Sequence, residues 1–178
     1  MYENCSFLVD VNIAWLRQAE GLLKQTADIV FTSSPAGMAP HRVSSQMRHV
    51  LEFYECFLNG LGKGRIDYDS RKRNHILEKS RSAAVETAQR LICELEQARD
   101  LPGDCFLSVR MEDSEDEVWL ASSFARELQS LASHTIHHFA LIAMTLRLHG
   151  VSVDPDFGVS PSTLSYRKSK RSLAAEAA

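Results

Sequence analysis

The sequence predicts an all-α fold, a four-helix bundle with a long crossover between its third and fourth helices and a C-terminal loop packed on the bundle. Apolar residues recur at steps of three and four over four long segments, which is the period of an amphipathic helix. Glycine, proline and serine cluster between these segments. The apolar content of 44% and the charged content of 24% over 178 residues are typical of one globular domain.

The first two helices are expected over residues 7–24 and 42–61. The loop between them contains Ser33-Ser34-Pro35-Ala36-Gly37, and three glycines between residues 60 and 64 end the second helix. Within that helix, His49 lies beside the apolar stripe that runs from Val43 to Leu61. A histidine at this position can therefore reach the edge of the core.

The third helix is expected over residues 70–99, after Asp69 as a helix cap and before Pro102 and Gly103. Residues 105–118 alternate apolar and polar positions and then become acidic. We expect an irregular crossover there, with one short extended piece or a hairpin. The fourth helix is expected over residues 122–149, where Gly150 ends it.

Beyond Gly150, the apolar residues of a loop that includes Phe157 can fold back onto the bundle. Residues 167–178 are expected to form a disordered tail, so the predicted domain covers residues 1–166. The basic cluster at residues 167–171 is interpreted as part of this solvated tail.

Charge and composition exclude several classes of function. The net charge of −3 gives no general attraction to nucleic acid or to an anionic membrane, so neither partner is expected. No apolar stretch is long enough to span a bilayer, and the first residues lack a secretion signal. The four scattered cysteines are interpreted as reduced thiols, which predicts a cytoplasmic protein.

The most informative pattern is a group of three histidines within residues 134–138. His134 and His138 are four residues apart and so project from one face of the fourth helix. This spacing allows two imidazoles to bind one metal ion. His49 can supply a third ligand if the second and fourth helices are neighbours. His137 is interpreted as lying beside the site or on the surface, with replacement of His138 as the alternative.

Three histidines with open coordination positions are typical of a catalytic metal site rather than a closed structural one. Zinc, nickel, iron and manganese all accept imidazole ligands. Tyr54, Tyr68 and Arg71 are candidates for lining a pocket near the metal, and the alternative is that they are structural groups with hydrogen-bond partners in the fold. The alternative from spacing alone is a metal-free bundle in which the histidines form hydrogen bonds in the core.

Several segments resemble the DinB-like (DinB/YfiT) superfamily: Met47-Arg48-His49-Val50-Leu51, residues 66–73, Arg126-Glu127-Leu128-Gln129, residues 134–138 and the loop 157–164. The resemblance spans nearly the whole chain. It implies a four-helix bundle that binds one divalent metal through three histidines, one from the second helix and two from the last. On this sequence these are His49, His134 and His138, the trio that spacing selects.

Some members of that superfamily are transferases or isomerases that use mycothiol, bacillithiol or a related low-molecular-weight thiol. The carboxylate that replaces one histidine in the mycothiol-dependent maleylpyruvate isomerases is missing here, which argues against that reaction. We therefore expect a metal-dependent enzyme, a thiol-dependent transferase or a hydrolase, acting on a small molecule. The rival interpretation is a non-catalytic helical protein of the stress response that binds metal or a small ligand. A homodimer formed through an exposed helix face is compatible with either.

Overall fold

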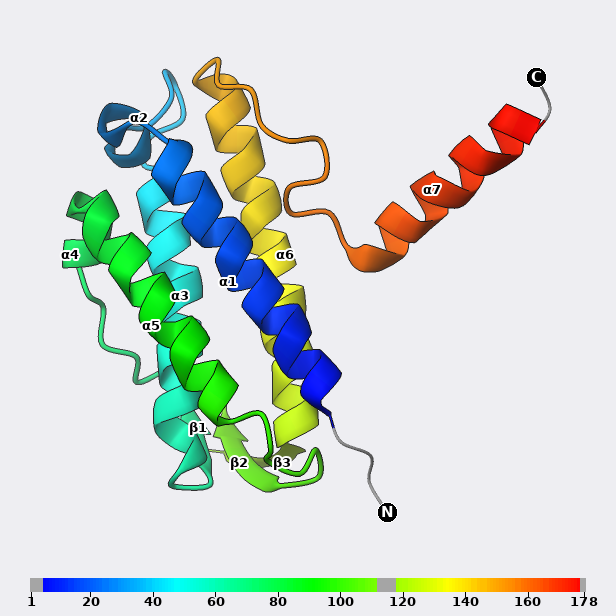
Figure 1. Cartoon of the computed structure of the whole chain (residues 1–178). Helices are drawn as coiled ribbons and strands as arrows, with labels where there is room; N and C mark the ends of the chain where they lie inside the picture. Colours follow the sequence, from blue (N-terminus) through cyan, green and yellow to red (C-terminus); the bar gives the residue numbers. More distant parts are fainter. Residues whose placement is uncertain (1–4, 112–117, 177–178) are drawn as a thin grey trace.

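Four long helices form the body of the protein in the computed structural model, which describes residues 5–111 and 118–176 (Figure 1). They are arranged in a ring, in which α1 contacts α5 and α6, and α3 contacts the same two helices. Their bounds are α1 (Ser6–Gln25), α3 (Val43–Leu61), α5 (Arg81–Gln97) and α6 (Phe124–Leu148). The other helices of the described residues are α2 (Asp28–Thr32), α4 (Ile76–Lys79) and α7 (Pro161–Glu176).

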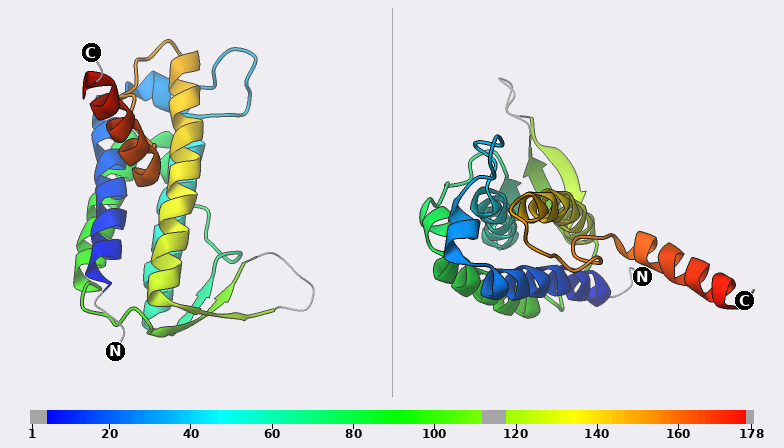
Figure 2. Two further views of the ribbon diagram at one scale, coloured as in Figure 1. Left: turned by 90° about the vertical axis from the view of Figure 1, so that its right-hand side faces the viewer. Right: turned by 90° about the horizontal axis from the view of Figure 1, so that it is seen from above.

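The prediction of an all-α fold is wrong, because the described residues also form a three-stranded mixed sheet. The middle strand, β2, pairs with β1 in parallel and with β3 antiparallel. Figure 2 shows the sheet at the end of the bundle where α6 begins. The strand β1 has only three residues, too few to show the alternation by which a strand is recognised in a sequence. The strands are β1 (Arg65–Asp67), β2 (Phe106–Arg110) and β3 (Leu120–Ser123).

Helices α3 and α5 run in the same direction, so the chain must return along the bundle between them (Figure 1). Residues 62–80 make this return through β1, a loop and α4. The third long helix is therefore shorter than the range 70–99 that the sequence predicts. It begins after Ser80, whose hydroxyl accepts a hydrogen bond from the amide of Ala83 at 3.2 Å. The second long connection, residues 98–123, contains β2 and β3.

A buried polar network joins three of the long helices. The Tyr54 hydroxyl of α3 donates to Asn12 Oδ1 of α1 at 2.8 Å and accepts from the Thr135 hydroxyl of α6 at 3.2 Å. The amide of Asn12 donates to the Leu128 carbonyl oxygen at 3.0 Å. Because buried polar groups are costly without partners, this network favours one relative position of the helices. Thr135 is adjacent to His134, so the network also positions the histidines of α6.

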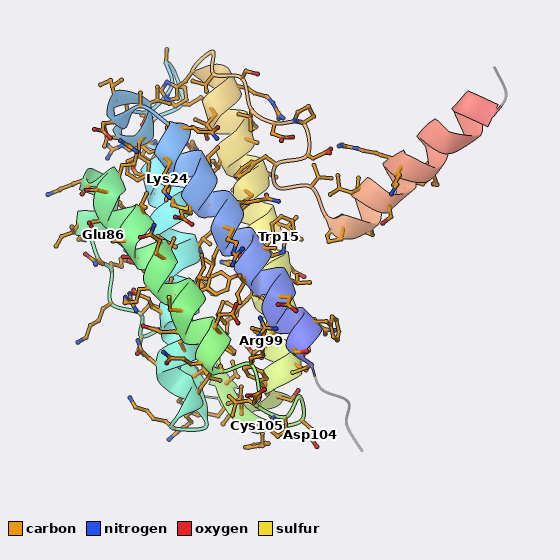
Figure 3. The ribbon with its side chains drawn as sticks, viewed as in Figure 1. Trp15, Lys24, Glu86, Arg99, Asp104 and Cys105 are labelled. Carbon is orange, nitrogen blue, oxygen red and sulfur yellow. The ribbon has the colours of Figure 1, made fainter. Side chains whose placement is uncertain are left out.

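The outer faces of the bundle are polar. Figure 3 shows Lys24 on α1 and Glu86 on α5, both exposed, whereas Trp15 lies on the side of α1 that faces α6. Trp15 is buried and packs edge-on against Phe139, with ring centroids 6.1 Å apart. Across residues 5–111 and 118–176, none of the helices has both the length and the apolar character required to cross a bilayer.

The loop after α6 packs on the bundle through an aromatic stack. The rings of Phe157 and Phe139 are 4.7 Å apart and nearly parallel. Gly158 has a φ of +69°, and a Cβ at this position would lie 2.7 Å from the Cβ of Phe139. Helix α7 then extends away from the bundle (Figure 1) and continues to Glu176, through most of the segment predicted to be disordered. The predicted domain of residues 1–166 stays a prediction.

The contact between α3 and β1 yields a stability prediction. A Cβ on Gly60 would lie 2.6 Å from the carbonyl oxygen of Arg65 and equally close to Ile66 Cγ1. We expect Gly60→Ala to lower the free energy of unfolding by about 1–3 kcal/mol, because the strand must shift. Urea denaturation measures this loss. In the control, Gly62→Ala, the added Cβ meets no atom within 4 Å. Equal stabilities of the two variants would contradict the close packing.

Candidate metal centre

The structure brings together the three histidines that the sequence singles out. His49 comes from α3, and His134 and His138 come from α6, two helices that lie in contact. One ring nitrogen from each histidine lies within 4.8 Å of the other two. The Nε2 atoms of His49 and His134 are 3.0 Å apart. The three rings therefore converge on one point between the two helices.

This arrangement fits the donor set of a divalent transition metal. Nitrogen ligands at about 2.0–2.1 Å from a tetrahedral zinc ion lie about 3.3 Å from one another. The His49–His134 separation of 3.0 Å is close to that spacing. Within the described residues, the group contains no carboxylate or thiol. Three neutral ligands leave the full charge of a bound divalent ion in place, and the cluster could hold such an ion.

Gln46 fixes the tautomer of one of these histidines. Its Oε1 atom lies 2.6 Å from Nδ1 of His138, so the ring donates its Nδ1–H to the amide oxygen. The lone pair of the ring is then on Nε2, the nitrogen left for a metal. The sequence pattern does not single out Gln46, because a glutamine on a helix is an ordinary surface residue. Its position one turn before His49 on α3 is the signal that could have identified it.

The three imidazoles are held in their neutral form. Burial lowers the pKa of His49 to about 3, and the nearby His138 and His134 lower it in the same direction. Burial likewise lowers the pKa of His134 and of His138 to about 4. At neutral pH all three rings therefore carry the free lone pair that a metal ligand requires.

Aromatic and cationic side chains form one wall of the centre. The Phe53 ring lies 4.0 Å from the His134 ring and 4.7 Å from the His49 ring. Tyr68 stacks on Phe53 at 5.1 Å, and the Arg71 guanidinium lies 4.1 Å from the centre of the Phe53 ring. Two of the candidates for lining a pocket, Tyr68 and Arg71, thus lie near the centre. The third candidate, Tyr54, instead belongs to the buried network of the core.

Two buried carboxylates hold this wall in place. Glu52 of α3 is 3% exposed and accepts a hydrogen bond from the Asn74 amide at 2.7 Å. Glu127 of α6 accepts from the Tyr68 hydroxyl at 3.0 Å. Burial and the adjacent Glu127 raise the pKa of the Tyr68 hydroxyl, so it remains a donor. Residues 68–74 are thereby fixed against both helices that carry the histidines.

His137 lies outside the group of converging nitrogens. Its side chain is exposed, and its ring packs edge-on against His138 at 5.1 Å. The alternative in which His137 replaces His138 does not match this geometry. His137 therefore serves as a natural control for experiments on the cluster.

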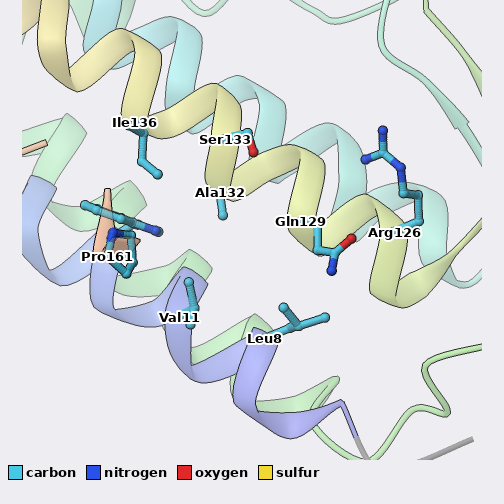
Figure 4. A pocket seen from close by; sticks show the side chains of 9 residues that line it. Leu8, Val11, Arg126, Gln129, Ala132, Ser133, Ile136 and Pro161 are labelled. Atoms are coloured by element: carbon cyan, nitrogen blue, oxygen red, sulfur yellow. The ribbon is translucent and has the colours of Figure 1, made fainter. Parts of the chain in front are cut away.

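A separate groove of about 410 Å³ lies between α1 and α6 (Figure 4). Leu8 and Val11 of α1 line it, as do Ala132 and Ile136 of α6. Ala132 and Ile136 are two residues before and after His134, so they lie on the opposite side of the helix from that histidine. The groove is therefore distinct from the candidate metal centre.

Comparisons with known proteins add a limited similarity. No family model matches the chain. FK506-binding protein 5 of Rhizopus delemar is 35% identical to it over 106 residues, which is 58% of this chain and 28% of that protein. The chain thus spans less than a third of the length of that relative. The similarity does not establish a family for this chain.

The lowered pKa values of the three histidines predict that acid destabilises the metal-free protein. Unfolded histidines titrate near 6.5, so between about pH 6.5 and pH 4 the unfolded state binds more protons than the folded state. The free energy of unfolding should therefore fall as the pH falls through this window. Urea denaturation of chelator-treated protein at several pH values measures the slope.

Two variants test whether the cluster is responsible for this slope. His134→Gln removes one of the titrating rings, so its stability should depend less steeply on pH. His41→Gln, which replaces an exposed histidine outside the cluster, should keep the slope of the wild-type protein. Identical slopes for the wild type and His134→Gln would refute this assignment.

Proposed function

We propose that this protein is a metal-dependent enzyme whose divalent ion is bound by His49, His134 and His138. The observation that carries the proposal is the convergence of three neutral imidazole nitrogens within 4.8 Å. The resemblance to the DinB-like superfamily supports the same three ligands. It also favours a thiol-dependent transferase or a hydrolase as the type of enzyme. The similarity to FK506-binding protein 5 covers 28% of that protein and contributes nothing to the choice.

When bound, a divalent ion of this kind lowers the pKa of a coordinated water or thiol, which makes the nucleophile available near neutral pH. The residues of the chain would supply the setting for that chemistry. His49, His134 and His138 hold the ion, and Gln46 keeps the His138 ring in the tautomer that can bind it. Phe53 and Arg71 form the side of the centre next to His134.

The half-buried thiol of Cys56, which lines the same side of α3 as His49, is not suited to act as the nucleophile. Its Sγ donates to the Asp67 carbonyl oxygen at 3.1 Å, and burial raises its pKa to about 11. Cys56 is therefore a neutral thiol at physiological pH. This observation favours an external water or a low-molecular-weight thiol over Cys56 as the nucleophile.

Metal content is the first test of the proposal. Tag-free protein should contain about one equivalent of zinc, nickel, iron or manganese after purification or after incubation with the metal and dialysis. The double variant His134→Ala/His138→Ala should contain none, because only one ligand remains. His137→Ala should keep the wild-type content. A wild-type protein that takes up no metal, or a double variant that retains it, would rule out the proposed ligands.

The hydrogen bond from His138 to Gln46 gives a second test. Gln46→Ala removes the acceptor that orients the ring, so the affinity for zinc should fall about 10- to 100-fold. Gln46→Glu keeps an acceptor oxygen and should retain most of the affinity. Competition with a chromogenic chelator measures both constants. Equal losses in the two variants would show that the acceptor oxygen is not what matters.

A further inference from the structure

A cleft of about 780 Å³ lies beside the candidate metal centre, between α3, β1 and the loop of residues 68–72. Its floor follows one face of α3, through Glu52, Cys56 and Asn59. His49 lies on the same face, one turn before Glu52. Cys56 follows His49 by seven residues, which corresponds to a rise of about 10 Å along the helix axis. The end of the cleft at Glu52 therefore lies one helical turn from His49.

Arg71 connects the cleft with the centre. It lines the cleft, and its guanidinium lies 4.1 Å from the centre of the Phe53 ring, which in turn contacts His134. The guanidinium thus lies between the cleft and the three converging imidazoles.

The carboxylates that line the cleft form ion pairs with arginines from outside its lining. Each of the three has an arginine partner that is not a lining residue. The pairs are Glu52 with Arg48 at 3.0 Å, Asp67 with Arg110 at 3.8 Å, and Glu55 with Arg90. The ion pairs of these carboxylates are thus made with arginines outside the lining, and Glu52 also acts on the charge of Arg71.

The four cations of the lining are Lys63, Arg65, Arg71 and Lys72. Among the described residues, none of them forms an ion pair with a carboxylate. Arg65 lies over the Trp119 ring at 3.8 Å, and one Arg71 nitrogen donates to the Tyr68 carbonyl oxygen. Neither contact cancels a charge. Among the described lining residues, four cations face three carboxylates whose ion pairs go to arginines outside the lining, so the described lining presents a net positive charge.

We infer that this cleft binds the anionic group, a carboxylate or a phosphate, of the small-molecule substrate. Guanidinium and ammonium groups bind these anions through charge-assisted hydrogen bonds, and a guanidinium can bind both oxygens of one group. The inference extends the proposed function, because it names the charge of the substrate and the residues that select it. The cleft and its cations exist independently of a bound metal, so the two ideas can be tested apart.

The experiment uses chelator-treated protein and two probes, inorganic phosphate and glutarate, at constant ionic strength. The chain has two tryptophans, Trp119 in the lining of the cleft and Trp15 in the core. Their indole N–H signals, assigned with Trp15→Phe, are followed by two-dimensional NMR. We expect one of the anions, or both, to shift the Trp119 signal with saturation and to leave the Trp15 signal in place. The stronger probe identifies the phosphate or the carboxylate as the preferred group.

Variants show whether the cations of the cleft cause this binding. The double variant Lys63→Gln/Lys72→Gln removes two exposed charges without breaking a described contact. Its affinity for the anion should fall about tenfold or more, because charge-assisted hydrogen bonds are lost. The affinity of the Arg71→Gln variant for the anion should fall by a similar factor. The control Arg73→Gln/Lys79→Gln removes two exposed charges nearby but outside the lining and should bind like the wild type.

Three results would overturn the inference: no saturable shift of the Trp119 signal in the wild type, an unchanged affinity in Lys63→Gln/Lys72→Gln, or an equal loss in the control. The last result would mean that the anion responds to the general field of the protein. Because the metal is absent throughout, failure here leaves the metal content unaffected. A protein that takes up no metal can still bind the anion.

Discussion

Helices α3 and α6 carry the three histidines between them, so the fit of these two helices decides whether the rings meet. The fit is held by apolar packing and by the buried network of Asn12, Tyr54 and Thr135. A slip of one helix along the other would leave those polar groups without partners in the core, at a cost of about 1–3 kcal/mol for each group. The same slip would move His134 away from His49. The core network and the candidate metal centre therefore depend on one register.

The second constraint comes from buried carboxylates. Glu52 binds the Asn74 amide and the Arg48 guanidinium, and Glu127 binds the Tyr68 hydroxyl and the Ser122 hydroxyl, the latter at 2.5 Å. A buried carboxylate is tolerated only when its oxygens are satisfied, so these contacts fix the chain that returns from α3 to α5. That chain carries Arg71. The position of this arginine beside the histidines thus follows from polar groups that make no contact with a ligand.

These constraints produce a candidate metal centre whose described residues include no acidic ligand. The histidines are neutral, the described residues of the cluster include no acidic ligand, and the nearest charged group of the wall is the guanidinium of Arg71. A divalent ion in such a setting would keep its full charge, which favours anionic ligands over neutral ones. The cations of the neighbouring cleft act in the same direction. The chemistry of the centre and the charge of the cleft are therefore compatible with one anionic substrate.

Sequence periodicity located the helices over residues 7–24, 42–61 and 122–149 to within two residues of α1, α3 and α6. It also selected the three histidines, because the four-residue spacing of His134 and His138 is a local property of a helix. It failed at the third helix, since Ile76 and Leu77 continue the apolar pattern across a break that the cap at Ser80 creates. It also missed β1, which is a strand because it pairs with the distant β2.

The tertiary structure decided the features that depend on contacts between distant segments. Gln46 reaches His138 across 92 positions of the chain, and Tyr68 reaches Glu127 across 59. Arg71 reaches the centre only because the chain after β1 turns back along α3. The local pattern of residues determines helices and the faces on which side chains lie, since both follow from the helical period. The partners across those faces are determined by packing, because hydrogen bonds and charge pairs form wherever the fold brings two groups within reach.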